Sequence, residues 1–460
     1  MVAAAFPVVS GLGQAEPVDG SRCHDPGATY QTATPESVNI DQGKLRRALD
    51  YWTAHGSDTV KVLRYDCLVG ESRLDPVSDK LPHVIFSHTK SILSLVVGRA
   101  EEQGLLSVDD PIGKYLPEGL GDSAHRALTI KHFLTMTTGL RMNWTRELGG
   151  QLNGTKPDRV REALSLPIDH QPGTWFEYAQ TPLFVLTYVV ERATRQDFQD
   201  YADQQLLSKM GIPRDDWFWG RDRAGHSDGP GWAVFMRPAH FPRFGQLLMN
   251  EGTWNGSRLV NASYIKDMRT GTKANPGYGY LYWLNSADHF VNASIWGRHQ
   301  ISGTPIPTAP KDMYFSWGYV GQHTFVIPSL HMIVTRTGNI APDTLEALDD
   351  PGNAAIMGRQ KKAYYEFFKL LMDAVSDAHP PEPPPYQANR WTFDFDAGAW
   401  VNPLENLAAV NLGPNAPEGC IPGACDGAAG FEGYALFAGD AARAMISSVH
   451  DITGTATPPR

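Results

Sequence analysis

A nucleophile and a base could come from Ser87 and Lys90, which stand three residues apart. They open the stretch 84–105, where apolar residues recur every three or four positions and predict a largely buried helix. Side chains three apart share a helix face, about 5–6 Å apart at Cβ, so the amine can touch the hydroxyl. An adjacent base and the positive end of a helix dipole both activate a serine. The pair therefore predicts acyl-transfer chemistry.

The Ser-x-x-Lys spacing also has an ordinary structural interpretation. Ser87 could cap the helix while Lys90 is solvated in its first turn. The same spacing recurs at Ser263 and Lys266, where the sequence predicts only a surface helix. The surrounding sequence therefore has to distinguish the two interpretations.

A second candidate nucleophile is Ser227, in the Gly-x-Ser-x-Gly motif GHSDG at 225–229. That motif works at a sharp turn that follows an apolar strand and precedes a helix. Here the polar run WGRDRA precedes it and Gly-Pro-Gly follows it. We therefore expect a polar loop at Ser227 and favour Ser87.

Composition and charge restrict the classes of partner. The 460 residues, 42% hydrophobic with 12 Trp, predict a globular chain with two lobes, or one large domain with an insertion. The net charge of −10, with no Lys/Arg block, argues against nucleic acid or an anionic membrane as a partner. No apolar run reaches the roughly 18 residues that a membrane helix needs.

The cysteines indicate disulfides rather than a metal site, although the sequence leaves their pairing open. None of the four has zinc-ligand spacing, and we expect neither a metal nor a cofactor. They are Cys23, Cys67, Cys420 and Cys425. Glycosylation sequons point to the same oxidising compartment. They lie at Asn143, Asn153, Asn255, Asn261 and Asn292. Together these features predict a secreted, glycosylated protein.

The order of elements predicts an α/β (α+β) fold, in which an antiparallel sheet flanked by helices is split by an all-helical lobe. Residues 59–64, 278–284, 324–327 and 331–337 have strand composition, whereas 105–268 shows helical periodicity and no clean strand. Helices are expected at 40–55 and 358–378. The predicted divisions are an N-terminal segment 1–34, a sheet domain 35–104 and 272–378, a helical insertion 105–271, a Pro-rich linker 379–387 and an extension 388–460. The active site should lie between the lobes.

Five blocks of sequence carry a resemblance to a known family. They are FSHTKSILSLVVGRAEEQGLLSVDDPIGKYLP, LTIKHFLTMTTGL, PGTWFEYAQTPLFVLTYVVERAT, PRFGQLLMNEGTWNGSRLV and GYVGQHTFVIPSLHMIVTRTG. In this order they resemble the serine β-lactamase-like superfamily of class C and penicillin-binding-protein type, most of all the class C-type esterases and 6-aminohexanoate-dimer hydrolases. The resemblance spans about residues 35–378 and implies the β-lactamase-like fold.

The resemblance also implies roles for individual residues. Ser87 would be the acylated nucleophile and Lys90 its partner. The family's Tyr-x-Asn element is matched by Tyr178-Ala179-Gln180, so Tyr178 would be the second base or proton shuttle. Gln180 replaces the usual Asn with the same amide on a longer stem, which changes substrate anchoring more than catalysis.

The family's third element is Lys-Thr-Gly in lactamases and differs here. Trp317-Gly318-Tyr319 stands in its place, as in the esterase-like branch, and lacks the lysine directed at a lactam carboxylate. The oxyanion would lie between the N–H groups of Ser87 and Val320. Packed-aromatic interpretations of Tyr178 and Trp317 stay open alongside these roles.

These implications predict a cofactor-free serine hydrolase that acts on a small ester or amide through an acyl-enzyme. Lys and Tyr have ordinary pKa values of about 10.4 and 10, so the site must shift a pKa by about three units, roughly 4 kcal/mol. The sequence leaves open whether Lys90 or Tyr178 is the base. Esters come first because an alkoxide leaves more readily than an amine. The alternatives are a 6-aminohexanoate-dimer-type amidase, a D-amino-acid peptidase or β-lactamase, and an acyl-binding sensor without turnover.

Overall fold

The computed structural model describes residues 23, 30–141, 158–222, 225–227, 234–292, 298–339, 361–378, 382–386, 391–394 and 432–453. Most of the expected extension lies outside these ranges, and so do Cys420, Cys425, Asn143 and Asn153. The described ranges include every candidate catalytic and substrate-binding residue, from Ser87 to Val320.

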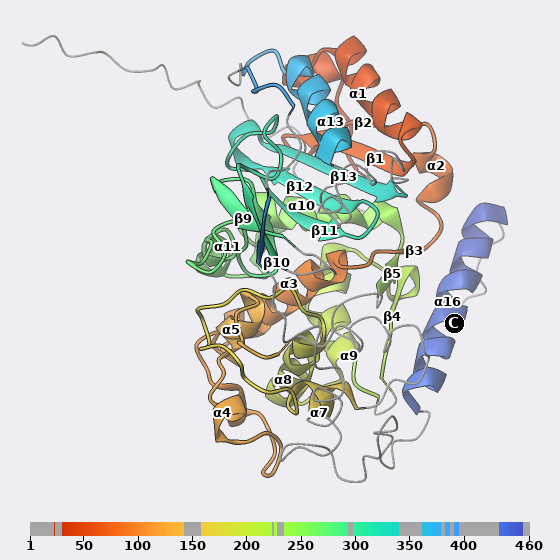
Figure 1. The fold of residues 1–460 in the computed structure, drawn as a ribbon. Coiled ribbons are helices and arrows are strands. Elements are labelled where there is room, and N and C mark those ends of the chain that lie inside the picture. The colour runs from red at the N-terminus through yellow and green to blue at the C-terminus, as the bar shows by residue number, and fades with distance from the viewer. Residues whose placement is uncertain are drawn as a thin grey trace, which may run out of the picture.

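A six-stranded antiparallel sheet forms the centre of the upper lobe in Figure 1, in the order β2-β1-β13-β12-β11-β8. Its strands are β1 (Ser57–Arg64), β2 (Cys67–Glu71), β8 (Trp283–Leu284), β11 (Tyr314–Gly318), β12 (Gln322–Ile327) and β13 (Met332–Gly338). Strands β1 and β13, which come from opposite sides of the insertion in the sequence, pair directly, as Val62 does with Val334. The predicted antiparallel sheet is therefore confirmed, although the strand expected at 278–284 is reduced to β8.

Helices cover both faces of this sheet (Figure 1). On one face lie α1 (Gln42–Ala54) and α13 (Lys361–Ala374), joined where Trp52 stacks on Phe367 with ring centroids 3.3 Å apart. The α1 helix begins at the expected amphipathic stretch, where the Asp41 side chain accepts a hydrogen bond from the N–H of Lys44. On the other face lie α3 (His88–Glu102) and α10 (Phe241–Met249). The helix that carries the candidate nucleophile is thus held directly under the sheet.

The lower lobe is mainly helical but not all-helical, which corrects the prediction for 105–271. Its helices include α4 (Ser123–Arg126), α5 (Ile130–Leu134), α7 (Arg159–Ala163), α8 (Phe184–Thr194) and α9 (Phe198–Ala202). Helix α11 (Ala262–Met268) belongs to the same range but is drawn in the upper half of Figure 1, at the level of β9. Within the same range, β4 (Trp217–Trp219) and β5 (Val234–Met236) form a small sheet with β3 (His83–Val84). Strands of two or three residues are too short to show an alternating pattern. Helix α10 also packs on β12 and β13, so part of this range covers the central sheet.

Shorter and peripheral elements complete the described chain. The strands are β6 (Thr253–Trp254), β7 (Ser257–Arg258), β9 (His289–Val291), β10 (Arg298–Ser302) and β14 (Trp391–Asp394). The 3-10 helices are Pro35–Val38, Ile112–Lys114, Thr181–Leu183, Ser208–Met210, Arg214–Asp216, Pro238–His240 and Pro328–Leu330, and Asp203–Leu207 is a π-helix. Two further helices are α2 (Asp75–Ser78) and α16 (Glu432–Thr453).

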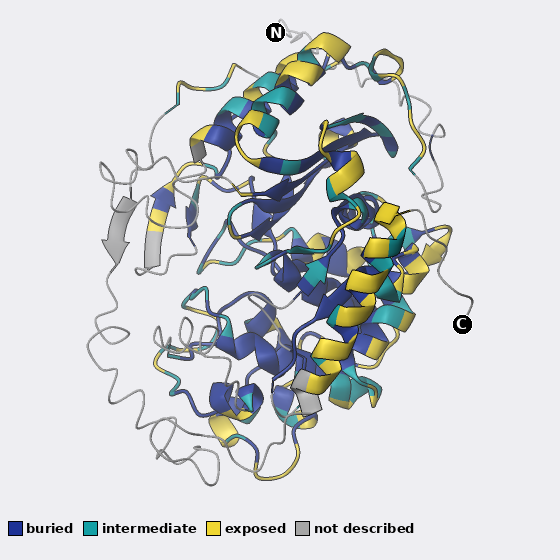
Figure 2. Cartoon of the chain, turned by 90° about the vertical axis from the view of Figure 1, so that its right-hand side faces the viewer, coloured by how far each residue is buried: buried dark blue, intermediate teal, exposed yellow. Residues whose placement is uncertain are grey.

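Helix α16 lies along the outside of the molecule against β4, as Figure 2 shows from the side. An ion pair of 2.8 Å between Arg214 and Asp440 ties it to the body of the protein. Its outward surface is largely apolar, with Met445, Ile446 and Val449 each more than half exposed. The described part of the extension therefore comprises this docked helix and the short strand β14, which pairs with β10.

The structure joins Cys23 to Cys67 in a disulfide. Of the sequons, Asn255 is exposed in the Asn-Gly turn between β6 and β7, and Asn261 is partly exposed. Asn292 is only 3% exposed, so a glycan there does not fit the fold and that part of the glycosylation prediction is wrong. No described helix combines the length and the apolar character needed to cross a membrane.

Candidate active site

Ser87 occupies the N-cap position of α3, directly after the strand β3 and two connecting residues. Its side chain makes no capping hydrogen bond, so the capping interpretation fails. The hydroxyl instead accepts a hydrogen bond from Lys90 Nζ at 2.8 Å. The preceding residue, Phe86, has φ +48°, a left-handed conformation that a bulky non-glycine residue rarely adopts. The backbone thus presents Ser87 at the mouth of the helix.

Lys90 is buried, with 1% of its surface exposed, so it is not a solvated first-turn lysine. Besides its contact with Ser87, its Nζ lies 4.9 Å from the centroid of the Tyr178 ring. Lys90 therefore lies between the two other predicted catalytic side chains.

Tyr178 comes from the loop before the 3-10 helix Thr181–Leu183 and reaches the same point. Its hydroxyl forms a hydrogen bond with Ser87. Burial raises the pKa of Tyr178 well above its ordinary value, although the hydrogen bond to Ser87 lowers it in part. Its ring stacks on Trp283, with centroids 5.8 Å apart. Tyr178 is therefore a neutral phenol near pH 7 that contacts the Ser87 hydroxyl, and its catalytic role stays a prediction.

The turn between β11 and β12 lies beside the segment that leads into Ser87. A Cβ atom on Gly318 would stand 2.4 Å from the carbonyl oxygen of Ile85, so only glycine allows this approach. The ring of Tyr319 meets that of Phe86 edge to face, with centroids 5.6 Å apart. Val320 has φ +55° in the same turn. These contacts are compatible with Val320 as an oxyanion donor, and that role stays a prediction.

The remaining predicted binding residues differ in where they lie. The indole of Trp317 is 5% exposed and packs in the core against His323 and Tyr364, with centroids 4.9 and 5.1 Å away. Tyr364 belongs to α13, on the face of the sheet opposite α3, so the packed-aromatic interpretation fits Trp317. Gln180 occupies the N-cap position of the 3-10 helix two residues beyond Tyr178, without a side-chain capping hydrogen bond, and its part in substrate anchoring stays a prediction.

Two buried histidines near the site serve packing. His88, directly after Ser87, lies against Phe241, and burial lowers its pKa to about 3. His323 contacts the Tyr364 hydroxyl at 2.5 Å, and burial lowers its pKa well below the ordinary value. Both rings are neutral at pH 7, and neither has a hydrogen bond to Ser87 among the described contacts. No group of three metal-ligating side chains occurs in the described part of the chain.

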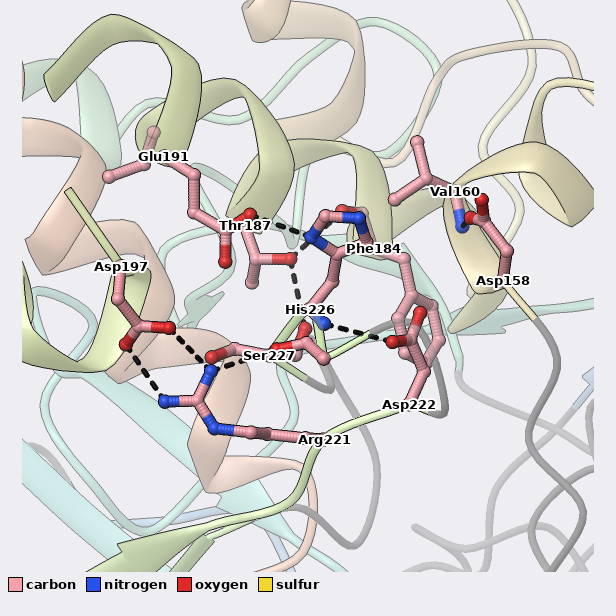
Figure 3. A network of polar contacts seen from close by, with 12 residues as sticks. Asp158, Val160, Phe184, Thr187, Glu191, Asp197, Arg221, Asp222, His226 and Ser227 are labelled. Atoms are coloured by element: carbon pink, nitrogen blue, oxygen red, sulfur yellow. Dashed lines mark hydrogen bonds and ion pairs between the residues drawn. The ribbon is translucent and has the colours of Figure 1, made fainter. Parts of the chain in front are cut away.

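Ser227 is not an accessible nucleophile. It has no exposed surface, and its hydroxyl accepts a hydrogen bond from Gln199 Nε2 at 3.2 Å. The ring nitrogen Nδ1 of the neighbouring His226 contacts the Glu191 carboxylate at 2.9 Å. Both terminal nitrogens of Arg221 donate hydrogen bonds to the Asp197 carboxylate (Figure 3). This polar network holds the lower lobe together, as expected for a structural loop.

The sequence did not identify the aromatic wall behind Tyr178, which consists of Trp283 and Tyr278. Besides Trp283, the ring of Tyr278 lies 6.1 Å from that of Tyr178, and the two wall residues meet each other edge to face. Composition indicated a strand here, but no motif marks either side chain as part of a site. Only the fold brings them to Tyr178.

Comparison with known proteins places this geometry in a family. A family model described as Beta-lactamase matches residues 69–355, more than half of the chain. Monacolin J acid methylbutanoyltransferase of Aspergillus terreus is 25% identical over 224 residues, which are 42% of this chain and 52% of that protein. Esterase EstB of Burkholderia gladioli is 32% identical over 142 residues, 27% of this chain and 36% of that protein. The chain thus spans about half and about a third of these two relatives.

Among solved structures, a candidate 6-aminohexanoate-dimer hydrolase from Bacillus anthracis superposes with a TM-score of 0.53 at 15% identity, covering 71% of this chain and 87% of that one. At this identity the similarity shows a common fold and no more. The antiparallel sheet, the Ser-x-x-Lys helix beneath it and the matching family model agree with one another. The chain belongs to the β-lactamase family of serine hydrolases.

Proposed function

We propose that this protein hydrolyses carboxylic esters through an acyl-enzyme on Ser87. The observation that carries the proposal is the 2.8 Å contact between Lys90 Nζ and Ser87 Oγ in a site where Lys90 is buried. A neutral amine at that distance takes the hydroxyl proton as the oxygen attacks the carbonyl carbon. Water then hydrolyses the acyl-enzyme and releases the acid.

Tyr178 donates the second proton in this mechanism. Its raised pKa keeps the phenol protonated near neutral pH, and its hydrogen bond to Ser87 places it where the leaving alkoxide departs. Lys90 is accordingly the base for the first step and Tyr178 the acid for the second. The protonated Lys90 then returns a proton to the Tyr178 phenolate, so that Lys90 can take the proton of the water that attacks the acyl-enzyme. The N–H groups of Ser87 and Val320 bind the oxyanion.

An ester is favoured over a lactam or an amide by the residues around the turn. The position of the lactamase Lys-Thr-Gly lysine is held by Trp317, so a substrate carboxylate lacks that cation. Instead, Tyr319 is 46% exposed beside Phe86 and offers an aromatic surface to an uncharged substrate. The identity to a named esterase, across the 142 residues that match, points to the same substrate class.

The test is a comparison of three substrates with the purified protein: a p-nitrophenyl ester, the p-nitroanilide of the same acyl group, and a chromogenic cephalosporin. We expect kcat/KM for the ester to exceed that for the anilide by at least about 100-fold, ~2.7 kcal/mol in the barrier, with no cephalosporin turnover. Equal rates on ester and anilide would make the protein an amidase. A stable acyl adduct in the intact mass, without turnover, would make it an acyl sensor.

We further propose that the protein is secreted and carries a glycan at Asn255. The Cys23–Cys67 disulfide suits an oxidising compartment, and the Asn255 side chain is exposed in a turn, whereas Asn292 is buried. In a eukaryotic secretory host, Asn255→Gln should remove one glycan from the intact mass, and Asn292→Gln, the matched control, should remove none. A glycan at Asn292 instead would contradict the fold there.

A further inference from the structure

Arg336, on β13, is a fully buried cation whose hydrogen bonds all go to main-chain carbonyls. Its surface is 0% exposed, and Nη1 donates to the carbonyl oxygen of Gly321 at 2.6 Å and to that of Val320 at 3.4 Å. Nη2 donates to Gly56 at 3.1 Å and to His55 at 3.4 Å. Within the described ranges no carboxylate lies within ion-pair distance of it. Burial lowers the pKa of Arg336 to about 10, as expected for a cation out of water.

A second buried arginine shows the usual arrangement in the same sheet. Arg64, on β1, is 2% exposed and also donates to carbonyls, at Val38 and Leu330. Its charge, however, is neutralised by an ion pair, in which Nη2 contacts both carboxylate oxygens of Asp377, at 2.8 and 3.1 Å. Leaving a buried charge without such a partner is costly. Because no ion pair in the described part of the chain offsets the cost of burying Arg336, we expect the segment that its hydrogen bonds stabilise to be functionally important.

Those hydrogen bonds hold the turn that carries the predicted oxyanion donor. Val320 has φ +55°, which a β-branched residue rarely adopts, and Gly321 follows with φ +108°. Arg336 fixes the carbonyl of Val320 on one side, and Gln322 Nε2 contacts the carbonyl of Tyr319 at 3.4 Å on the other. The two peptide planes that flank Val320 are thus both held from the core side of the turn.

We propose that Arg336 is a positioning residue for ester hydrolysis, which holds the 319–321 turn so that the N–H of Val320 meets the oxyanion of the tetrahedral intermediate. The inference rests on the proposed function. The bonds to His55 and Gly56 anchor the guanidinium to the α1–β1 connection, so the turn is fixed to a rigid part of the sheet domain. The guanidinium also draws electron density from the turn's peptides, which makes the N–H a stronger donor.

The test compares Arg336→Met with Arg64→Met, which removes an equally buried guanidinium far from the turn. Active sites are counted by titration with a fluorophosphonate, and kcat and KM for a p-nitrophenyl ester are expressed per active site. We expect Arg336→Met to lower kcat by about 100-fold, the effect of losing one oxyanion donor, with KM changed less than about threefold. Arg64→Met should lower the melting temperature and leave kcat per site near wild type.

Phenylboronic acid, which forms a tetrahedral adduct on serine, gives the second readout. Its inhibition constant should rise in Arg336→Met by about the same factor as kcat falls, and stay unchanged in Arg64→Met. If Arg336→Met does not fold, Arg336→Lys keeps the charge but cannot bridge the turn and Gly56, and the same kcat loss is expected. Wild-type kcat and boronate affinity per site in either Arg336 variant would overturn the inference. Absence of wild-type ester turnover would instead overturn the proposed function, while the boronate comparison still tests Arg336.

Discussion

Replacing Ser87 with alanine should lower p-nitrophenyl ester hydrolysis by at least about 10⁴-fold, to the level of oxyanion binding alone. The reason is that Ser87 Oγ forms the bond to the acyl group, and both Lys90 and Tyr178 contact that one hydroxyl. The fluorophosphonate adduct should disappear from the intact mass in the same variant. Because Ser87 makes no capping bond, the melting temperature should change little.

Two other serines provide matched controls for that result. Ser227→Ala removes the buried serine of the Gly-x-Ser-x-Gly motif, and Ser263→Ala removes the exposed serine of the second Ser-x-x-Lys pair on α11. Both should keep turnover within about threefold of wild type, since neither hydroxyl touches the site. An adduct that survives in Ser87→Ala and vanishes in Ser227→Ala would refute the proposed nucleophile.

The contact between Ser87 and Lys90 could be predicted from the sequence because it is local. A helix of known period fixes the distance between side chains three apart, and the apolar pattern of α3 predicted the helix. The approach of Tyr178 could not be predicted in this way, since it depends on how two lobes meet. Only the resemblance to a known family supplied it, through the order of blocks along the chain.

The side of the sheet that a residue faces could not be predicted either. A shift of one residue in register exchanges the two faces of a strand, and every residue of β11 around Trp317 is buried, so the sequence shows no solvent-facing side. Its indole therefore packs under α13, although its neighbour Gly318 lies against the nucleophile segment. Likewise, Arg336 in the run VTRTG suggests a solvent-facing strand position, and only the tertiary contacts with Gly56 and Gly321 bury it.

Replacing Lys90 with methionine should lower ester turnover by about 10³- to 10⁴-fold, the contribution of a positioned base, because methionine fills the buried space without an amine. A general base acts only in its deprotonated form, so loss of the base should remove the rising limb of the wild-type pH–rate profile in Lys90→Met. The raised pKa of Tyr178 determines the alkaline side of the pH–rate profile. Activity should fall only above about pH 10, where an ordinary tyrosine ionises. Lys266→Met, which replaces an exposed lysine of α11, should leave both limbs unchanged. If Lys90→Met kept its turnover and its pH rise while Tyr178→Phe lost both, Tyr178 would be the base.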